Sequence, residues 1–147
     1  MKKILSLMLA GVLALAVSGC SEAPKELTNI GVFEDYQLEL TGAEKFTNDE
    51  GQSMVRVKGV YTNNAADPEY GLACFAVRAF QNDTELTDYT DINGDESSLI
   101  TEVKNGASVD VSYVFKLTDE SEVEVLIGTP TADQDTIGKA VYFKTEE

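Results

Sequence analysis

The chain between Val109 and Leu117 alternates apolar and polar side chains. Valine, tyrosine, phenylalanine and leucine fill every second position, and mainly polar residues stand between them. Successive side chains of a β-strand point to opposite faces, so this spacing gathers the apolar set on one face. A helix would need a spacing of about 3.6 residues instead. The segment therefore predicts a strand with one buried face. Because a strand needs neighbouring strands as hydrogen-bond partners, the chain is expected to form a β-sheet.

Apolar segments recur between clusters of glycine, asparagine, aspartate and proline: Tyr36–Thr41, Met54–Thr62, Leu72–Phe80, Leu99–Val103, Val123–Ile127 and Ala140–Lys144. The most continuously apolar of them, Leu72–Phe80, predicts a central strand buried on both faces. The stretch Gly128–Gly138 predicts a loop. Seven to eight strands at this spacing predict an all-β fold, an immunoglobulin-like antiparallel β-sandwich.

Two further features bear on how the sandwich packs. Gly59 interrupts an otherwise regular strand and predicts a bulge or a close backbone neighbour. The chain has no tryptophan, so the expected core depends on smaller aromatic side chains: Tyr61, Phe75, Tyr113, Phe115 and Phe143.

The N-terminus has the order of a secretory signal. Two positive charges, Lys2 and Lys3, precede an apolar run from Ile4 to Val17, an arrangement typical of signal peptides. The run is shorter than the roughly 20 residues that a membrane-crossing helix needs. The sequence therefore predicts a removable signal peptide rather than a permanent membrane span.

The residues that follow the apolar run resemble a bacterial lipobox. Val17, Ser18 and Gly19 stand directly before Cys20, which in such motifs receives a diacylglyceryl group and becomes the first residue of the mature chain. Acyl chains, palmitate among them, bind the bilayer by about 0.8 kcal/mol per buried methylene, so two or more chains anchor stably. The alternative is an ordinary signal peptide with an incidental cysteine. We expect an extracytoplasmic protein, anchored by lipid to the bacterial cell membrane.

These features divide the chain into a signal peptide over 1–19, a lipidated cysteine with a flexible tether over 20–34, and one β-sandwich domain over 35–147. Residues 27–35 could belong to the tether or to the first edge of the domain. The mature length suits a single domain with a core of its own.

The mature chain is strongly acidic. The full sequence holds 11 basic and 26 acidic residues, and removal of Lys2 and Lys3 with the signal leaves a formal charge of −17. Such a surface repels phosphate backbones, which excludes nucleic acid as a partner, and it also repels anionic lipid. We expect attachment to the membrane through the lipid and an envelope protein or glycan as partner.

Residues that carry chemistry are scarce. The absence of histidine removes serine and cysteine triads and histidine metal sites, and no phosphate-binding glycine loop or paired-cysteine motif occurs. No carboxylate pair stands out among the many acids. With Cys20 lipidated, Cys74 has no disulfide partner, and its apolar neighbours predict a buried small hydrophobe, a reactive thiol being the alternative. We therefore expect no enzymatic activity.

One acidic segment resembles a calcium loop in part. Asp91, Asn93, Asp95 and Glu102 stand at positions 1, 3, 5 and 12 of a twelve-residue window, but position 6, which should be glycine, is Glu96. A solvated acidic loop is the main expectation. The alternative is a looser calcium site or ligand loop, with residues drawn from Asp88, Tyr89, Asp91, Asn93, Asp95, Glu96 and Glu102.

Several strand-forming motifs resemble a family of bacterial, mainly Gram-positive, surface lipoproteins that carry one immunoglobulin-like domain of unknown function. The resemblance spans Tyr36 to Thr129, with Asn105 where that family more often has proline. It rests on Val60–Asn64, Ala76–Asn82, Val103–Val109, Tyr113–Asp119 and Glu122–Val125. It implies an architecture and transfers no catalytic residues.

The function expected from the sequence is a non-catalytic binding or interaction module at the cell envelope. The alternative is a calcium-responsive or calcium-stabilised surface domain that uses the acidic loop from Asp88 to Glu96. No resident cofactor is expected apart from the covalent lipid, with calcium as the only candidate.

Overall fold

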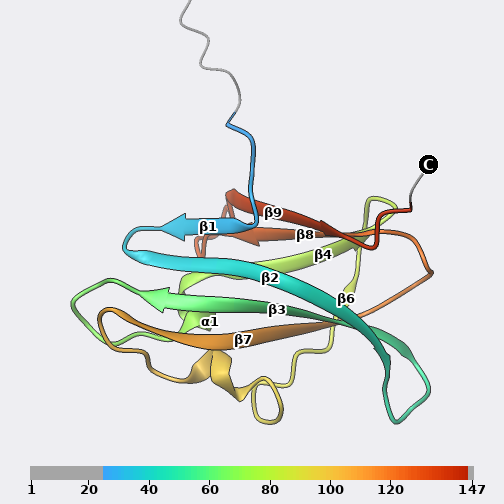
Figure 1. Ribbon diagram of the computed structural model, residues 1–147, viewed down its shortest axis with the longest axis horizontal. Helices are drawn as coiled ribbons and strands as arrows, with labels where there is room; N and C mark the ends of the chain where they lie inside the picture. Colours follow the sequence, from blue (N-terminus) through green and yellow to red (C-terminus); the bar gives the residue numbers. More distant parts are fainter. Residues whose placement is uncertain (1–24, 146–147) are drawn as a thin grey trace, which may run out of the picture.

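The computed structural model describes residues 25–145. The signal peptide, the motif Val17, Ser18 and Gly19, and Cys20 lie outside this range. Two antiparallel sheets face each other as a β-sandwich (Figure 1), as the sequence predicts. In chain order the elements are β1 (Ile30–Phe33), β2 (Tyr36–Thr47), β3 (Ser53–Asn63), α1 (Gly71–Cys74), β4 (Ala76–Gln81), β5 (Thr84–Glu85), β6 (Thr87–Asp88), η1 (Ser97–Ile100), β7 (Ala107–Lys116), β8 (Val123–Gly128) and β9 (Thr136–Tyr142).

The first sheet has the strand order β1-β2-β3-β7-β6, and the second has the order β5-β4-β8-β9. The long strands β2, β3 and β7 form the body of the first sheet. Val57 of β3 pairs with Tyr113 of β7, and Val55 pairs with Phe115. All four side chains are buried, because alternate positions of each strand face the second sheet. The period-two prediction for β7 is confirmed.

A bulge in β2 lies opposite Gly59. The register between β2 and β3 shifts between Leu40 and Gly42, where Gly59 is the partner. A Cβ atom at Gly59 would lie 2.8 Å from the backbone oxygen of Glu39, closer than a carbon and an oxygen can approach. Both readings of this glycine, a bulge and a close neighbour, are therefore confirmed.

The predicted central strand Leu72–Phe80 is wrong in its first half. Residues Gly71–Cys74 form one helical turn, in which Phe75 donates its N–H to the Gly71 oxygen, and the strand starts only at Ala76. The turn buries Cys74 and exposes Leu72. An apolar run does not by itself distinguish a strand from a buried turn of helix, and here it spans both.

Three other expectations need correction. The segment Leu99–Val103 is not a strand, since Ser97–Ile100 form a 3-10 helix and Val103 makes only an isolated bridge to Glu69. The last strand starts at Thr136, within the expected loop. Strand β1 lies inside the expected tether and pairs with β2, so the folded domain starts before residue 35.

The core contains the expected aromatic side chains with one exception. Tyr61, Phe75, Tyr113 and Phe115 are buried. Phe143 instead lies half-buried at the rim, with a φ of +58° and the Lys45 ammonium 4.8 Å from its ring centre. The strand has ended at that point, and the ring packs against the outside of the core.

Cys74 is a free, buried cysteine, as its apolar neighbours predict. Its Sγ lies 3.5 Å from the Tyr61 hydroxyl. Burial raises the pKa of the thiol, and the negative charge of Glu69 adds to the effect. A thiol that stays protonated is a poor nucleophile, which disfavours the reactive-thiol alternative.

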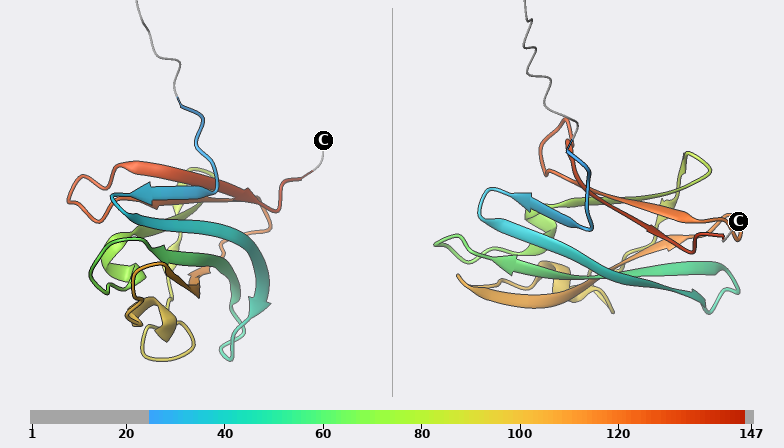
Figure 2. Two further views of the ribbon diagram at one scale, coloured as in Figure 1. Left: turned by 60° about the vertical axis from the view of Figure 1, so that its left-hand side comes forward. Right: turned by 45° about the horizontal axis from the view of Figure 1, so that its top comes forward.

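Different elements cover the two edges of the sandwich, where the sheets do not pair with each other. On one side β1 approaches β9, and the Lys139 N–H donates to the Thr28 oxygen at 2.7 Å. On the other side η1 packs along β7 and beside α1, and it inserts Leu99 into the core. Figures 1 and 2 show the chain entering beside β1 and β9, while η1 lies at the opposite edge.

Candidate functional site

The acidic loop folds back over the outer face of the first sheet. The Tyr89 N–H donates to the Val114 oxygen at 2.7 Å, and the Val114 N–H donates to the Thr90 hydroxyl at 3.0 Å. These bonds attach the start of the loop to β7, at the position that pairs with Arg56 of β3. The loop therefore rests on the sheet instead of projecting into solvent.

A groove of about 270 Å³ lies between this loop and the sheet. We call it the loop groove. Its lining combines aromatic, apolar and acidic side chains with one arginine: Phe46, Asn48, Met54, Arg56, Tyr89, Asp91, Gly94, Asp95, Glu96 and Val114. Tyr89 is 41% exposed at its mouth, whereas Met54 and Val114 form a buried floor.

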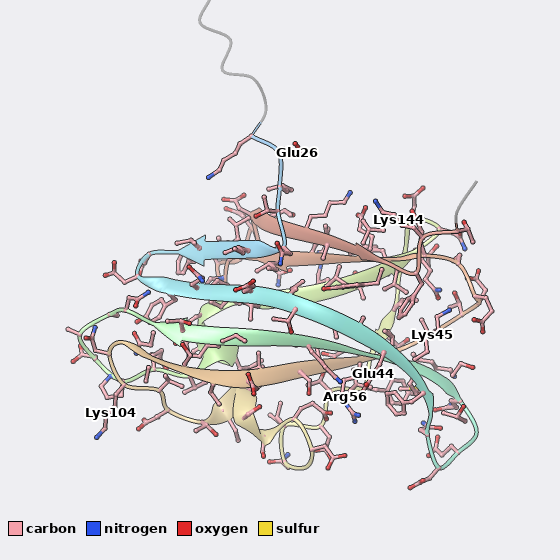
Figure 3. All side chains as sticks on the ribbon, viewed as in Figure 1. Glu26, Glu44, Lys45, Arg56, Lys104 and Lys144 are labelled. Carbon is pink, nitrogen blue, oxygen red and sulfur yellow. The ribbon has the colours of Figure 1, made fainter. Side chains whose placement is uncertain are left out.

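Arg56 lies at the centre of the charged groups. Its guanidinium stacks over the Phe46 ring, 4.8 Å from the ring centre. It also reaches three carboxylates, with nitrogen-to-oxygen distances of 3.4 Å to Glu96, 3.6 Å to Glu44 and 3.9 Å to Asp95. Figure 3 shows Arg56 and Glu44 together on this part of the sheet.

Glu96 is the unusual member of the set, because its side chain is only 3% exposed. Its Oε2 accepts the Asp91 N–H at 3.0 Å. Its Oε1 faces Arg56 Nε but accepts no hydrogen bond. Buried carboxylates are rare unless they are paired, so this residue links the loop to the sheet by charge as well as by packing.

Glu44 forms the outer side of the cluster. Lys58 donates a 2.8 Å hydrogen bond to its carboxylate. That hydrogen bond, with the charge of Lys58 and a smaller contribution from Arg56, holds the pKa of Glu44 below its usual value. The carboxylate is therefore ionised throughout the neutral range.

The structure brings only part of the predicted loop set together. Tyr89, Asp91, Asp95 and Glu96 line the loop groove, but Asp88, Asn93 and Glu102 do not. Asp88 instead accepts the Thr90 N–H at 2.8 Å. Asp91 accepts the Asn93 N–H at 3.1 Å within its own turn, and Glu102 is exposed beyond η1.

The acidic side chains of the loop do not converge into a set of calcium ligands. Among residues 25–145 no group of three or more acidic or cysteine side chains is close enough to hold a metal ion. Glu96, at position 6 of the calcium-like window, turns inward to Arg56. The calcium site stays a prediction that the geometry does not favour.

The other half of the loop groove comes from strands far away in the sequence. Phe46, Met54 and Arg56 belong to β2 and β3. A single arginine between apolar residues in a strand is a weak indication of a binding site, because a solvent-exposed position on the outer face of a sheet gives the same pattern. Only the pairing of β2, β3 and β7 places it beside Glu96.

A larger hollow of about 490 Å³ lies on the outer face of the second sheet, between β4 and β8. Two of its charged groups are paired, since Arg78 lies 3.7 Å from Glu85 and Glu124 pairs with Lys139. The other two, Asp83 and Glu122, are exposed. No buried polar atom without a hydrogen bond lines it. We therefore place the candidate site at the loop groove, where Glu96 supplies such an atom.

No helix in the described part of the chain has the length and hydropathy to span a bilayer. A search of curated proteins found no match to the chain.

Solved structures with a similar fold come from three Gram-positive bacteria. A candidate lipoprotein from Staphylococcus aureus superposes with a TM-score of 0.56 at 11% identity, over 77% of this chain and 90% of that one. A protein from Enterococcus faecalis gives a TM-score of 0.53 at 17% identity, over 80% and 90%. A candidate lipoprotein from Bacillus subtilis gives 0.53 at 14% identity, over 80% of this chain and 38% of that one. Identities this low support the β-sandwich fold alone.

A family model matches residues 20–127, from the predicted lipidated cysteine into β8. The match covers more than half of the sequence, and the family is described only as a domain of unknown function. The chain therefore belongs to the DUF5067 family.

Proposed function

We propose that this protein is a lipid-anchored, extracytoplasmic immunoglobulin-like module that binds an envelope partner through the loop groove and catalyses no reaction. The observation that carries the proposal is the position of the groove. The acidic loop and η1 lie at the edge of the sandwich opposite the start of the described chain, which leads into β1 (Figures 1 and 2). A domain held by its N-terminus at a membrane would present the groove outward.

The lining supports a binding role. Loops held on a rigid sandwich are common sites of recognition, and Tyr89 and Phe46 provide the aromatic contact area that interfaces favour. The lining is acidic, with Asp91, Asp95 and Glu96 around a single Arg56. We therefore expect the partner to present positive charge, and the association to weaken with salt.

Site-specific cross-linking on intact cells tests this proposal. A photo-reactive amino acid replaces Tyr89 in the lipidated protein, and the matched control carries it at Tyr70, which is exposed to a similar extent but does not line the groove. The expected result is one species trapped from position 89 and not from position 70. A Cys20→Ala form, released from the membrane, should lose that product.

Trapping of the same species from both positions, or of none, would contradict a partner at the loop groove. Thermal unfolding with and without millimolar calcium addresses the alternative function. A calcium-stabilised domain should melt higher with the ion, and that increase should disappear in an Asp91→Asn, Asp95→Asn double variant.

A further inference from the structure

An exposed apolar patch lies where the chain enters the domain. Leu27, Ile30 and Val32 are 39%, 37% and 56% exposed, and they are three of the seven large apolar side chains that are exposed in the described chain. Together with Ile137 they line a shallow hollow of about 360 Å³. We call these four residues the entry patch.

The fold forces this exposure. Side chains of β1 alternate between the two faces, and Gly31 occupies an inward position. A Cβ atom at Gly31 would lie only 2.7 Å from Cγ2 of Ile127, so no larger residue fits there. With Gly31 inward, Ile30 and Val32 must point outward. Within residues 25–145 they remain 37% and 56% exposed.

The geometry points to the lipid bilayer as the surface that covers the entry patch, with the β1 and β9 edge of the sandwich against the membrane. This inference rests on the lipid anchor of the proposed function. Cys20 stands seven residues before Leu27, a reach of about 25 Å when fully extended. An anchored domain therefore stays within contact distance of the acyl region.

The composition of the entry patch fits an interfacial site. The transfer of aliphatic side chains from water to the boundary between headgroups and acyl chains lowers the free energy. Lys25 and Glu26 both line this hollow, so their charges balance, whereas three carboxylates and a single arginine line the loop groove on the outer face of the first sheet. The charge of the domain thus favours this orientation over the reverse one.

A second copy of the chain fits the patch less well. A stable dimer buries about 800 Å² on each partner, whereas β1 is four residues long. The neighbouring strand places Glu39 beside Ile30, and two copies would bring these carboxylates together.

Tryptophan fluorescence can test the orientation directly, because the natural chain has none. Val32→Trp places a reporter in the entry patch, and Tyr89→Trp places the same side chain at the loop groove. The mature lipidated proteins are inserted into phosphatidylcholine vesicles with or without brominated acyl chains. We expect bromine to quench Val32→Trp at least about twofold and to leave Tyr89→Trp nearly unchanged, since quenching needs insertion to the acyl boundary.

Two further variants separate contact from mere proximity. Replacing Leu27 and Ile30 by serine in the Val32→Trp protein should reduce the quenching, although the lipid anchor is intact. A Cys20→Ala form of Val32→Trp should lose it. Equal quenching at positions 32 and 89 in the lipidated proteins would overturn the inference, and so would no quenching at either position. A blue shift of the Val32→Trp fluorescence that depends on protein concentration without vesicles would also overturn it, because it would indicate a second copy on the patch.

These outcomes are distinct from those of the proposed function. Loss of the cross-link at position 89 with quenching retained at position 32 would reject the partner and keep the membrane orientation. The converse would keep the partner and reject the orientation. Mass spectrometry that finds no lipid on Cys20 would overturn both.

Discussion

Glu96 offers the sharpest test of how the loop groove is built. Its two carboxylate oxygens lie between two donors, the Asp91 N–H at 3.0 Å and Arg56 Nε at 3.4 Å. A glutamine has nearly the same shape but carries one oxygen and one NH₂ group. In either orientation of that amide, its NH₂ group points at one of these two donors, so two donors face each other without an acceptor. Glu96→Gln is therefore not a conservative change at this buried position.

The expected cost follows from that geometry. Leaving a buried polar group without its partner costs about 1–3 kcal/mol, and more where charge is involved. Breaking a fully buried ion pair costs about 3–5 kcal/mol. Arg56 is partly exposed and keeps two other carboxylates, so we expect about 2–3 kcal/mol. For a domain of this size that lowers the Tm by roughly 6–15 °C.

Asp95→Asn is the matched control. It removes the same charge from the same arginine, but Asp95 is 89% exposed and 3.9 Å away, so the loss should stay below about 0.5 kcal/mol. Urea unfolding of the three proteins gives the free energies, and hydrogen exchange should show faster opening of loop amides in Glu96→Gln. A Glu96→Gln protein within about 0.5 kcal/mol of the parent would refute the argument, as would equal losses in both variants.

Three other predictions concern the domain around the site. Gly59→Ala should destabilise by about 1–3 kcal/mol in urea unfolding, because its Cβ would meet the Glu39 oxygen at 2.8 Å and the backbone must move; an unchanged midpoint would contradict this. Hydrogen bonds from Ser121 lower the pKa of Asp119 below 3.8. The unfolded state then binds the proton more tightly than the folded state, so ionised Asp119 stabilises the fold at neutral pH. This contribution is lost as the pH falls below about 4. In Asp119→Asn, the free energy of unfolding should therefore decrease less steeply at acidic pH than in the parent. Cys74 should react with iodoacetamide at pH 8 only after unfolding, as followed by mass spectrometry, and rapid labelling of the native protein would show that its raised pKa and burial do not protect it.

Much of the sandwich can be read from local patterns. The alternation in Val109–Leu117 predicts β7, and the one in Val123–Ile127 predicts β8, because a half-buried strand imposes period two on its own sequence. Gly59 likewise marks the bulge, since only glycine tolerates the close approach of β2. In these places the local requirement and the tertiary structure agree.

Other elements depend on contacts that a local pattern does not contain. The run Leu72–Phe80 is apolar whether it forms a strand or a helical turn followed by a strand. Its first half becomes helix because Gly71 and Cys74 pack against Tyr61. Leu99 belongs to a 3-10 helix for a similar reason, since one apolar side chain is enough to close the open edge beside β7.

The candidate site was also predicted only in part by the sequence, and the tertiary structure decided the rest. The sequence by itself indicated that an acidic loop with Tyr89 would follow the strand region, and it predicts Cys20 as the point of lipid attachment. Only the tertiary structure decided that Glu96 turns inward while Asp95 stays in solvent. The partner that draws Glu96 inward, Arg56, stands forty residues earlier and reaches it through the pairing of β3 with β7. Long-range strand pairing of this kind sets which charges meet, and the spacing of residues within one loop does not contain it.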